Sequence, residues 1–259
     1  MLNLTKRQKF VITSALLSLG FIGINFLDNQ YRFWAIGFLT ALTVTLFFWS
    51  LIEGIGLDAR LLTLVLPALF TLSIGLFFFL LPASIFVRLP VVIAFGVGIY
   101  ALCLTTNIFT VSAIRTIALV RAAKGVGFVF TLLVLFFLYD TLFSLRLSIF
   151  PNTILILLAT LPLILQGLWQ SNLEKRVTKK LILHTVIITL SMSQVAVLLY
   201  FWPVTVIVGS IFLTIAAYVL LGLGQAFLEG RLFSQTVKEY LGIAMAVFIT
   251  MLLVTHWGA

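Results

Sequence analysis

Apolar runs of about twenty residues recur along the whole chain, and they restrict its fold more than any other feature. Each run is long enough to cross a hydrocarbon layer of about 30 Å as a helix. The 259 residues are 63% hydrophobic and only 9% charged, so polar side chains could not cover a soluble protein of this length. The sequence therefore predicts an all-α, polytopic transmembrane bundle that forms a single integral membrane domain over residues 1–259.

Short connections divide these runs into nine expected spans. The first run follows Lys6, Arg7 and Lys9 as the core of a secretory signal would, but it is longer than such a core and no small-residue cleavage site follows it. We therefore expect it to be retained as the first span. The spans are expected near residues 9–27, 34–52, 61–81, 91–110, 126–145, 153–170, 181–201, 205–224 and 240–257.

The positions of lysine and arginine predict how the spans are oriented. If the N-terminus is cytoplasmic, every basic residue except Arg32, Arg88 and Arg146 lies on the cytoplasmic side, as the positive-inside rule requires. We therefore expect a cytoplasmic N-terminus, a C-terminus on the outer side, and insertion in a bacterial plasma membrane. The net charge of +9 is then a sign of topology, and it gives no reason to expect a nucleic acid as partner.

Basic residues recur at multiples of three in SAIRTIALVRAAKGVGF, residues 112–128, as in a voltage-sensing helix. Residues 91–145 would extend about 82 Å as a helix, enough for two crossings and a surface segment only. Burying three cations would also cost roughly 8–10 kcal/mol. We therefore interpret the segment as a cytoplasmic connection.

Basic residues of two cytoplasmic connections are expected to contact the anionic headgroups of the cytoplasmic leaflet. They are Arg115, Arg121, Lys124, Lys175, Arg176, Lys179 and Lys180.

Two prolines fall inside expected spans and are candidate helix kinks. Pro67 and Pro162 each lack a backbone donor, which frees a carbonyl one turn earlier. Membrane helices tolerate proline for structural reasons, and transporters use broken helices to form binding sites. Between two further prolines, residues 82–90 are expected to form a short interfacial helix or a re-entrant turn.

Asp140 is the one carboxylate that falls inside an expected span, close to its outer end. A charged group in a membrane is costly and indicates function by default. We expect either structural contacts, with Ser144, Arg88 or Arg146, or a role in an outward-facing site.

Gln194 and Ser191 complete the candidate polar intramembrane site. They lie three residues apart, on one face of the seventh span and near its middle. This spacing suits hydrogen bonds between helices, worth about 0.6–2 kcal/mol each. An amide that binds a substrate would have the same pattern in the sequence.

Recognisable catalytic and metal-binding patterns are missing from the sequence. His184 and His256 are expected on opposite sides of the membrane, so they cannot share a metal ion, and Cys103 has no second cysteine. The glycines of AKGVGF follow no strand and lack the third glycine of a nucleotide-binding loop. We therefore expect no catalytic residues, no metal, no cofactor and no enzymatic activity.

Three functions are compatible with this pattern. The first is a non-enzymatic scaffold or accessory subunit of a membrane complex, with a membrane-protein partner or a second copy of the chain. The alternative is a transporter or permease for a small neutral or lipid-like substrate, which would use Asp140, Gln194 and the kinks. The third is an intramembrane transferase that acts on lipid and holds a phosphate headgroup with cytoplasmic cations.

Overall fold

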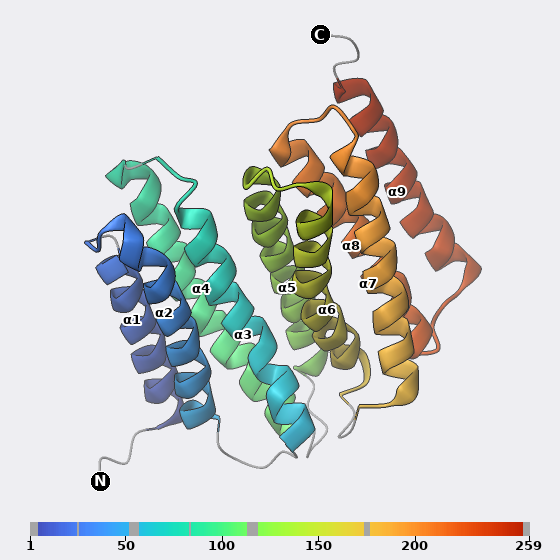
Figure 1. Ribbon diagram of the computed structural model, residues 1–259. Helices are drawn as coiled ribbons and strands as arrows, with labels where there is room; N and C mark the ends of the chain where they lie inside the picture. Colours follow the sequence, from blue (N-terminus) through green and yellow to red (C-terminus); the bar gives the residue numbers. More distant parts are fainter. Residues whose placement is uncertain are drawn as a thin grey trace. The chain divides into compact units, whose positions relative to one another are not determined.

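The structure is a computed structural model that describes residues 5–24, 26–51, 57–82, 84–112, 119–173 and 177–255. These residues form helices and connections without a β-strand (Figure 1). The helices are α1 (Lys6–Ile24), α2 (Asn29–Ser50), α3 (Leu57–Phe78), α4 (Ile85–Ser112), α5 (Val120–Ser144), α6 (Ile149–Asn172), α7 (Lys179–Tyr200), α8 (Val206–Leu228) and α9 (Ser234–Val254).

The predicted helical class and the order of the helices are confirmed for the described residues. Eight of these helices are long and apolar enough to cross a membrane, so the chain is a multi-pass membrane protein. The remaining helix, α1, opens with Lys6, Arg7 and Lys9, and these cations lower the hydropathy of its 19 residues. The orientation of the termini and the number of crossings stay predictions.

The start of α4 differs from the prediction. The sequence predicts a separate interfacial helix or a re-entrant turn at residues 82–90. This prediction is wrong for residues 85–90, because α4 begins at Ile85 and continues through Pro90. The missing N–H of Pro90 removes one intrahelical hydrogen bond in the second turn of α4, the bond to the backbone oxygen of Phe86, and the rest of the helix keeps its bonds. In addition, the guanidinium group of Arg88 lies 5.0 Å from the ring centre of Phe78 and holds this start against the end of α3.

Contacts divide the chain into two compact units, Met1–Phe130 and Thr131–Ala259, with the boundary inside α5. In the first unit, α1 packs on α2 and α4, and α3 packs on α2 and α4, which closes a four-helix bundle. Aromatic rings fill its centre. The ring pairs Phe21–Phe95, Phe21–Phe78, Phe70–Phe95 and Phe70–Phe130 have centroids 4.7, 5.0, 5.8 and 5.3 Å apart.

Small residues let α1 and α4 approach closely. The hydroxyl of Ser14 donates a hydrogen bond of 2.6 Å to the backbone oxygen of Gly96. A Cβ atom on Gly96 would lie 2.5 Å from Oγ of Ser18, so a larger residue here would displace the Ser18 hydroxyl. Between α2 and α3, the hydroxyl oxygens of Thr43 and Thr71 are 3.0 Å apart.

The second unit is built on α6, α7 and α8, each of which packs on the other two. The side-chain amide of Gln225 on α8 donates a 2.8 Å hydrogen bond to the backbone oxygen of Gly167 on α6. From α5, the hydroxyl of Tyr139 lies 2.8 Å from that of Thr160 on α6, and both residues are buried. Hydrogen bonds between side chains and neighbouring helices therefore supplement the apolar packing.

Helix α9 packs on α8 alone among the pairs with extensive contact. Met251 is its buried residue, and most of its other side chains are exposed. Its C-terminal end is held by Trp202, whose indole N–H donates to the hydroxyl of Thr255 at 2.9 Å. Most of the α9 surface is thus available to lipid or to another protein.

Candidate functional site

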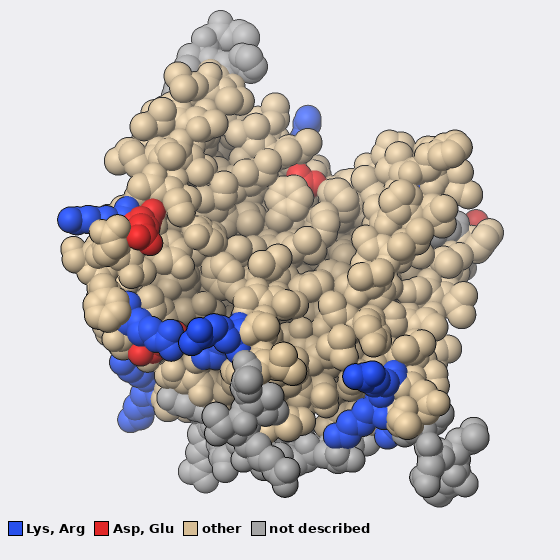
Figure 2. Space-filling view, turned by 180° about the vertical axis from the view of Figure 1, so that it is seen from behind, with Lys and Arg blue, Asp and Glu red and all other residues tan. Residues whose placement is uncertain are grey.

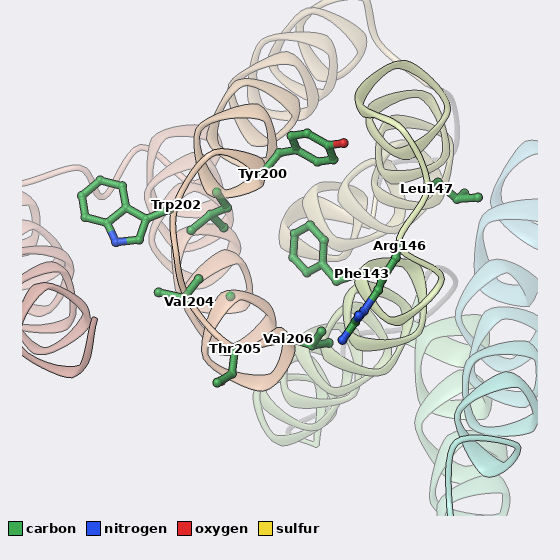
Figure 3. A pocket seen from close by; sticks show the side chains of 10 residues that line it. Phe143, Arg146, Leu147, Tyr200, Trp202, Val204, Thr205 and Val206 are labelled. Atoms are coloured by element: carbon green, nitrogen blue, oxygen red, sulfur yellow. The ribbon is translucent and has the colours of Figure 1, made fainter. Parts of the chain in front are cut away.

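A pocket of about 240 Å³ lies at the end of the second unit where the α5–α6 and α7–α8 connections meet (Figure 3). We call it the Arg146 pocket. Two connections and three helix ends supply its walls, so its shape depends on how α5 ends and α8 begins. The residues that line it are Phe143, Arg146, Leu147, Leu199, Tyr200, Trp202, Val204, Thr205, Val206 and Gly209.

Arg146 ends α5 with an unusual backbone conformation. Its φ angle is 48°, in the left-handed region that favours glycine, and its N–H donates to the oxygen of Phe143 at 3.2 Å. This conformation costs an arginine about 1–2 kcal/mol. Figure 3 shows the guanidinium group directed towards Val206, across the pocket wall. The strained turn therefore positions Arg146, the one cation among the described lining residues, at the pocket wall.

Asp140 is buried one helical turn before Phe143 of the pocket, with 6% of its surface exposed. The Ser210 hydroxyl lies 3.5 Å from Oδ1 of Asp140, and Ser210 directly follows Gly209 of the pocket. That hydroxyl also lies 2.8 Å from the backbone oxygen of Val206. A hydroxyl has one proton, and the shorter contact is the stronger hydrogen bond. The Asp140 carboxyl is therefore only weakly satisfied beside the pocket.

Both polar and apolar side chains line this pocket. Thr205 caps α8, its hydroxyl accepting the Val208 N–H at 3.5 Å, while Phe143 and Leu199 contribute apolar surface. Trp202 points away from Arg146 in Figure 3, in keeping with its bond to Thr255. A cation beside apolar walls suits a small amphiphile with an acidic or polar head.

The other polar residues predicted for the site lie elsewhere. Gln194 is exposed on α7, whereas Asp140 is buried on α5, and no hydrogen bond joins the two side chains in the described part of the chain. Ser191 is half-buried, and its hydroxyl donates to the backbone oxygen of Ile187 in its own helix at 2.9 Å. Such a bond satisfies a hydroxyl locally in a membrane helix.

Both predicted kink positions lie inside helices. Pro67 is buried in α3, and its backbone oxygen accepts the hydroxyl proton of Thr71 at 3.1 Å. Pro162 is half-buried in α6. They belong to different units, since α3 precedes and α6 follows the unit boundary.

The predicted cations lie at helix starts where the structure describes them. Arg121 and Lys124 are in the first two turns of α5, and Lys179 and Lys180 begin α7. The ammonium of Lys180 lies 4.7 Å from the ring centre of Phe227. Arg115, Lys175 and Arg176 lie outside the described residues.

The structure also contains buried polar side chains that the sequence analysis does not single out as candidate site residues. Five buried side-chain atoms of the second unit have no hydrogen-bond partner among the described residues: both amide atoms of Gln170, Oε1 of Gln166, Oδ1 of Asn152 and the hydroxyl of Thr189. We expected Gln170 at the very end of a span and Asn152 in a connection, but α6 runs from Ile149 to Asn172 and encloses both. The helical spacing of Gln166 and Gln170, four residues apart, is the signal that places them on one face.

In the described part of the chain, no three His, Cys, Asp or Glu side chains form a group that could hold a metal ion. Nδ1 of His184 lies 2.7 Å from the backbone oxygen of Lys180, and its ring stacks on Phe227 at 4.8 Å. His256 lies outside the described residues.

Comparison with known proteins places the chain in a family. Residues 12–254 match the family described as "Protein of unknown function (DUF5656)", and the chain belongs to it. No curated protein and no solved structure matches the chain significantly.

Proposed function

We propose that the protein is a non-enzymatic component of a membrane complex, a scaffold or accessory subunit that binds another membrane protein through α7. The exposed amide of Gln194 carries this proposal. It makes no side-chain hydrogen bond within the described part of the chain, although it is exposed in the middle of an apolar face.

That face of α7 follows the helical repeat. With Gln194 included, its members are spaced three or four residues apart, and the apolar ones are between 48% and 65% exposed: Leu183, Ile187, Leu190 and Leu198. Gln194 lies six residues before the end of α7 at Tyr200, which is about 9 Å along the axis. If α7 crosses the membrane, the amide lies in hydrocarbon.

An amide that faces lipid is costly, because burying it without a hydrogen bond costs roughly 2–7 kcal/mol. A second helix with a polar side chain at the same depth removes most of this cost, and such bonds contribute about 0.6–2 kcal/mol to association. The expected partner is therefore a transmembrane helix of another protein, apolar on one face except for one hydrogen-bonding side chain opposite Gln194.

The remaining expectations about placement belong to the same proposal. All nine helices cross a bacterial plasma membrane, the N-terminus is cytoplasmic, and Arg121, Lys124, Lys179 and Lys180 contact anionic headgroups. The excess of basic residues on alternate connections supports this orientation.

Extraction of the full-length, tagged protein from its native membrane in a mild detergent tests the proposal. The wild type is expected to elute as a complex larger than the monomer, with a second membrane protein identified by mass spectrometry. Gln194→Leu is expected to shift at least half of the protein to the monomer, because it removes the polar contact and keeps the volume and the helix.

Gln30→Leu is the matched control, since Gln30 is also exposed on a helix but lies in the first turn of α2. It is expected to leave the complex intact. A wild-type protein that elutes as a lone monomer, or as a complex of this chain only, would overturn the accessory-subunit proposal.

A permease is the second candidate, and the weakly satisfied Asp140 carboxyl beside the Arg146 pocket favours it. The pocket would admit a small lipid-like solute from the outer side. Uptake of a panel of metabolites by intact cells distinguishes the two functions: an Asp140→Asn variant that loses uptake while its complex stays intact would favour the permease.

A further inference from the structure

A second pocket, of about 170 Å³, lies at one end of the first unit and is separate from the Arg146 pocket. We call it the Lys9 pocket. The start of α1 and the ends of α2 and α4 form it, and α1 packs on both of the other helices. The residues that line it are Lys6, Lys9, Trp49, Ser50, Leu51, Asn107 and Thr110.

The start of α1 is fixed by a reciprocal cap. The N–H of Thr5 donates to Oε1 of Gln8 at 2.9 Å, and the N–H of Gln8 donates to the hydroxyl of Thr5 at 3.4 Å. This capping box holds the first turn of α1 and so positions the lysines that follow. Figure 2 shows lysine and arginine side chains grouped at one end of this unit.

Lys9 is held at the pocket by Trp49. Its ammonium lies 5.3 Å from the ring centre of Trp49, a contact that orients the cation and keeps its protons free for another acceptor. Opposite, the amide of Asn107 on α4 makes no side-chain hydrogen bond within the described residues, while the hydroxyl of Thr110 donates to the backbone oxygen of Asn107 at 2.8 Å.

The described lining thus offers the ammonium group of Lys9 and the amide donor of Asn107, with Lys6 beside them, and no carboxylate is among its described residues. A buried water requires about 10–15 Å³ of cavity volume, so the pocket has room for a tetrahedral anion. Lysine binds phosphate as a compact charge with three rotatable donors. We propose that the Lys9 pocket binds a phosphate group, supplied by an anionic phospholipid headgroup or by a soluble phosphate.

Another reading of the lysines is that they only balance the negative ends of α2 and α4, where backbone carbonyls lack partners. Diffuse attraction to an anionic membrane would also need no pocket. Both readings predict that lipid binding is unchanged when the cavity is filled and the charge is kept, whereas a built site predicts weaker binding. An apolar residue at position 107 therefore distinguishes a built site from both readings.

Calorimetric titration of the full-length protein in neutral detergent tests the proposal with three probes: dioctanoyl phosphatidylglycerol, dioctanoyl phosphatidylcholine and inorganic phosphate. Phosphatidylglycerol is expected to bind at least tenfold more tightly than phosphatidylcholine. Lys9→Gln is expected to weaken binding about fivefold, and Asn107→Leu is expected to weaken it at least as much while both lysines remain. Binding of inorganic phosphate as tight as that of the lipid assigns a soluble source, and binding of the lipid alone assigns a headgroup.

Lys180→Gln is the matched control, because Lys180 also lies over an aromatic ring but does not line the Lys9 pocket. It is expected to leave binding unchanged, and all variants are compared only where they elute and melt as the wild type does. Should Lys180→Gln weaken binding as much as Lys9→Gln, or should Asn107→Leu bind normally, the lysines act by diffuse charge and the pocket is no site.

Discussion

The hydroxyl of Ser210 lies 3.5 Å from Oδ1 of Asp140 and 2.8 Å from the backbone oxygen of Val206. One proton therefore faces two acceptors, and the closer acceptor is in its own helix. The carboxyl of Asp140 is left with a long contact although only 6% of its surface is exposed. Burial of a polar group with so little compensation is costly, so Asp140 is expected to lower the stability of the protein.

Asp140→Asn is therefore expected to stabilise the protein by roughly 1 kcal/mol, because a neutral amide of the same shape is less costly to bury than a carboxyl group. Thermal unfolding in detergent measures the effect. Ser210→Ala, which removes the long contact to Asp140 together with the bond of the same hydroxyl to the backbone oxygen of Val206, is expected to change stability by less than about 1 kcal/mol. A marked loss of stability in Asp140→Asn would contradict this account and indicate that a further group binds the carboxylate.

Gln170→Leu is expected to raise stability by about 1–3 kcal/mol, because neither polar atom of the buried Gln170 amide has a hydrogen-bond partner in the part of the chain that the structure describes. Gln225→Leu serves as the control on a partnered glutamine, since its amide donates to Gly167. That variant is expected to lose about 1 kcal/mol. Equal losses in both variants would show that Gln170 is bound by something the protein retains during purification, and thermal unfolding of the two side by side decides between these outcomes.

The helices could be predicted because twenty apolar residues have few other stable arrangements in a membrane. Their ends were less predictable, since a helix continues beyond the hydrocarbon layer. Hydropathy places Lys238 in a connection, yet it lies in the first two turns of α9. Hydropathy likewise puts the start of a span after Pro90, which lies inside α4.

The candidate site could be predicted only in part. A carboxylate in an apolar run singled out Asp140, but its nearest hydroxyl, on Ser210, comes from 70 residues further along the chain. The sequence also could not show which way Gln194 points, because α7 is apolar on all sides and has no amphipathic pattern to orient it. Which face of such a helix is buried depends on its neighbours.

Left-handed residues give a prediction about stability. Leu173 ends α6 with a φ angle of 51°, and Leu173→Gly is expected to stabilise the protein by about 1 kcal/mol, because glycine adopts this conformation without steric cost. Gly230 has a φ angle of 70°, and Gly230→Ala is expected to cost about the same amount. Chemical unfolding of both variants measures the pair, and a loss of stability in Leu173→Gly would mean that its side chain contributes more by packing than its backbone costs.

Gly98→Ala is expected to destabilise the first unit by about 1–3 kcal/mol, because an added Cβ would collide with the ring of Phe70. Phe70 is 2% exposed and its ring packs against Phe95 and Phe130, so it has little room to move.

Gly125→Ala is the control for Gly98→Ala, since no atom lies within 4 Å of its Cβ position in α5. It is expected to gain about 0.5–1 kcal/mol from the higher helix propensity of alanine. Thermal unfolding followed by circular dichroism compares the two variants, and an unchanged melting temperature in Gly98→Ala would show that the aromatic centre of the four-helix bundle is packed more loosely than these contacts require.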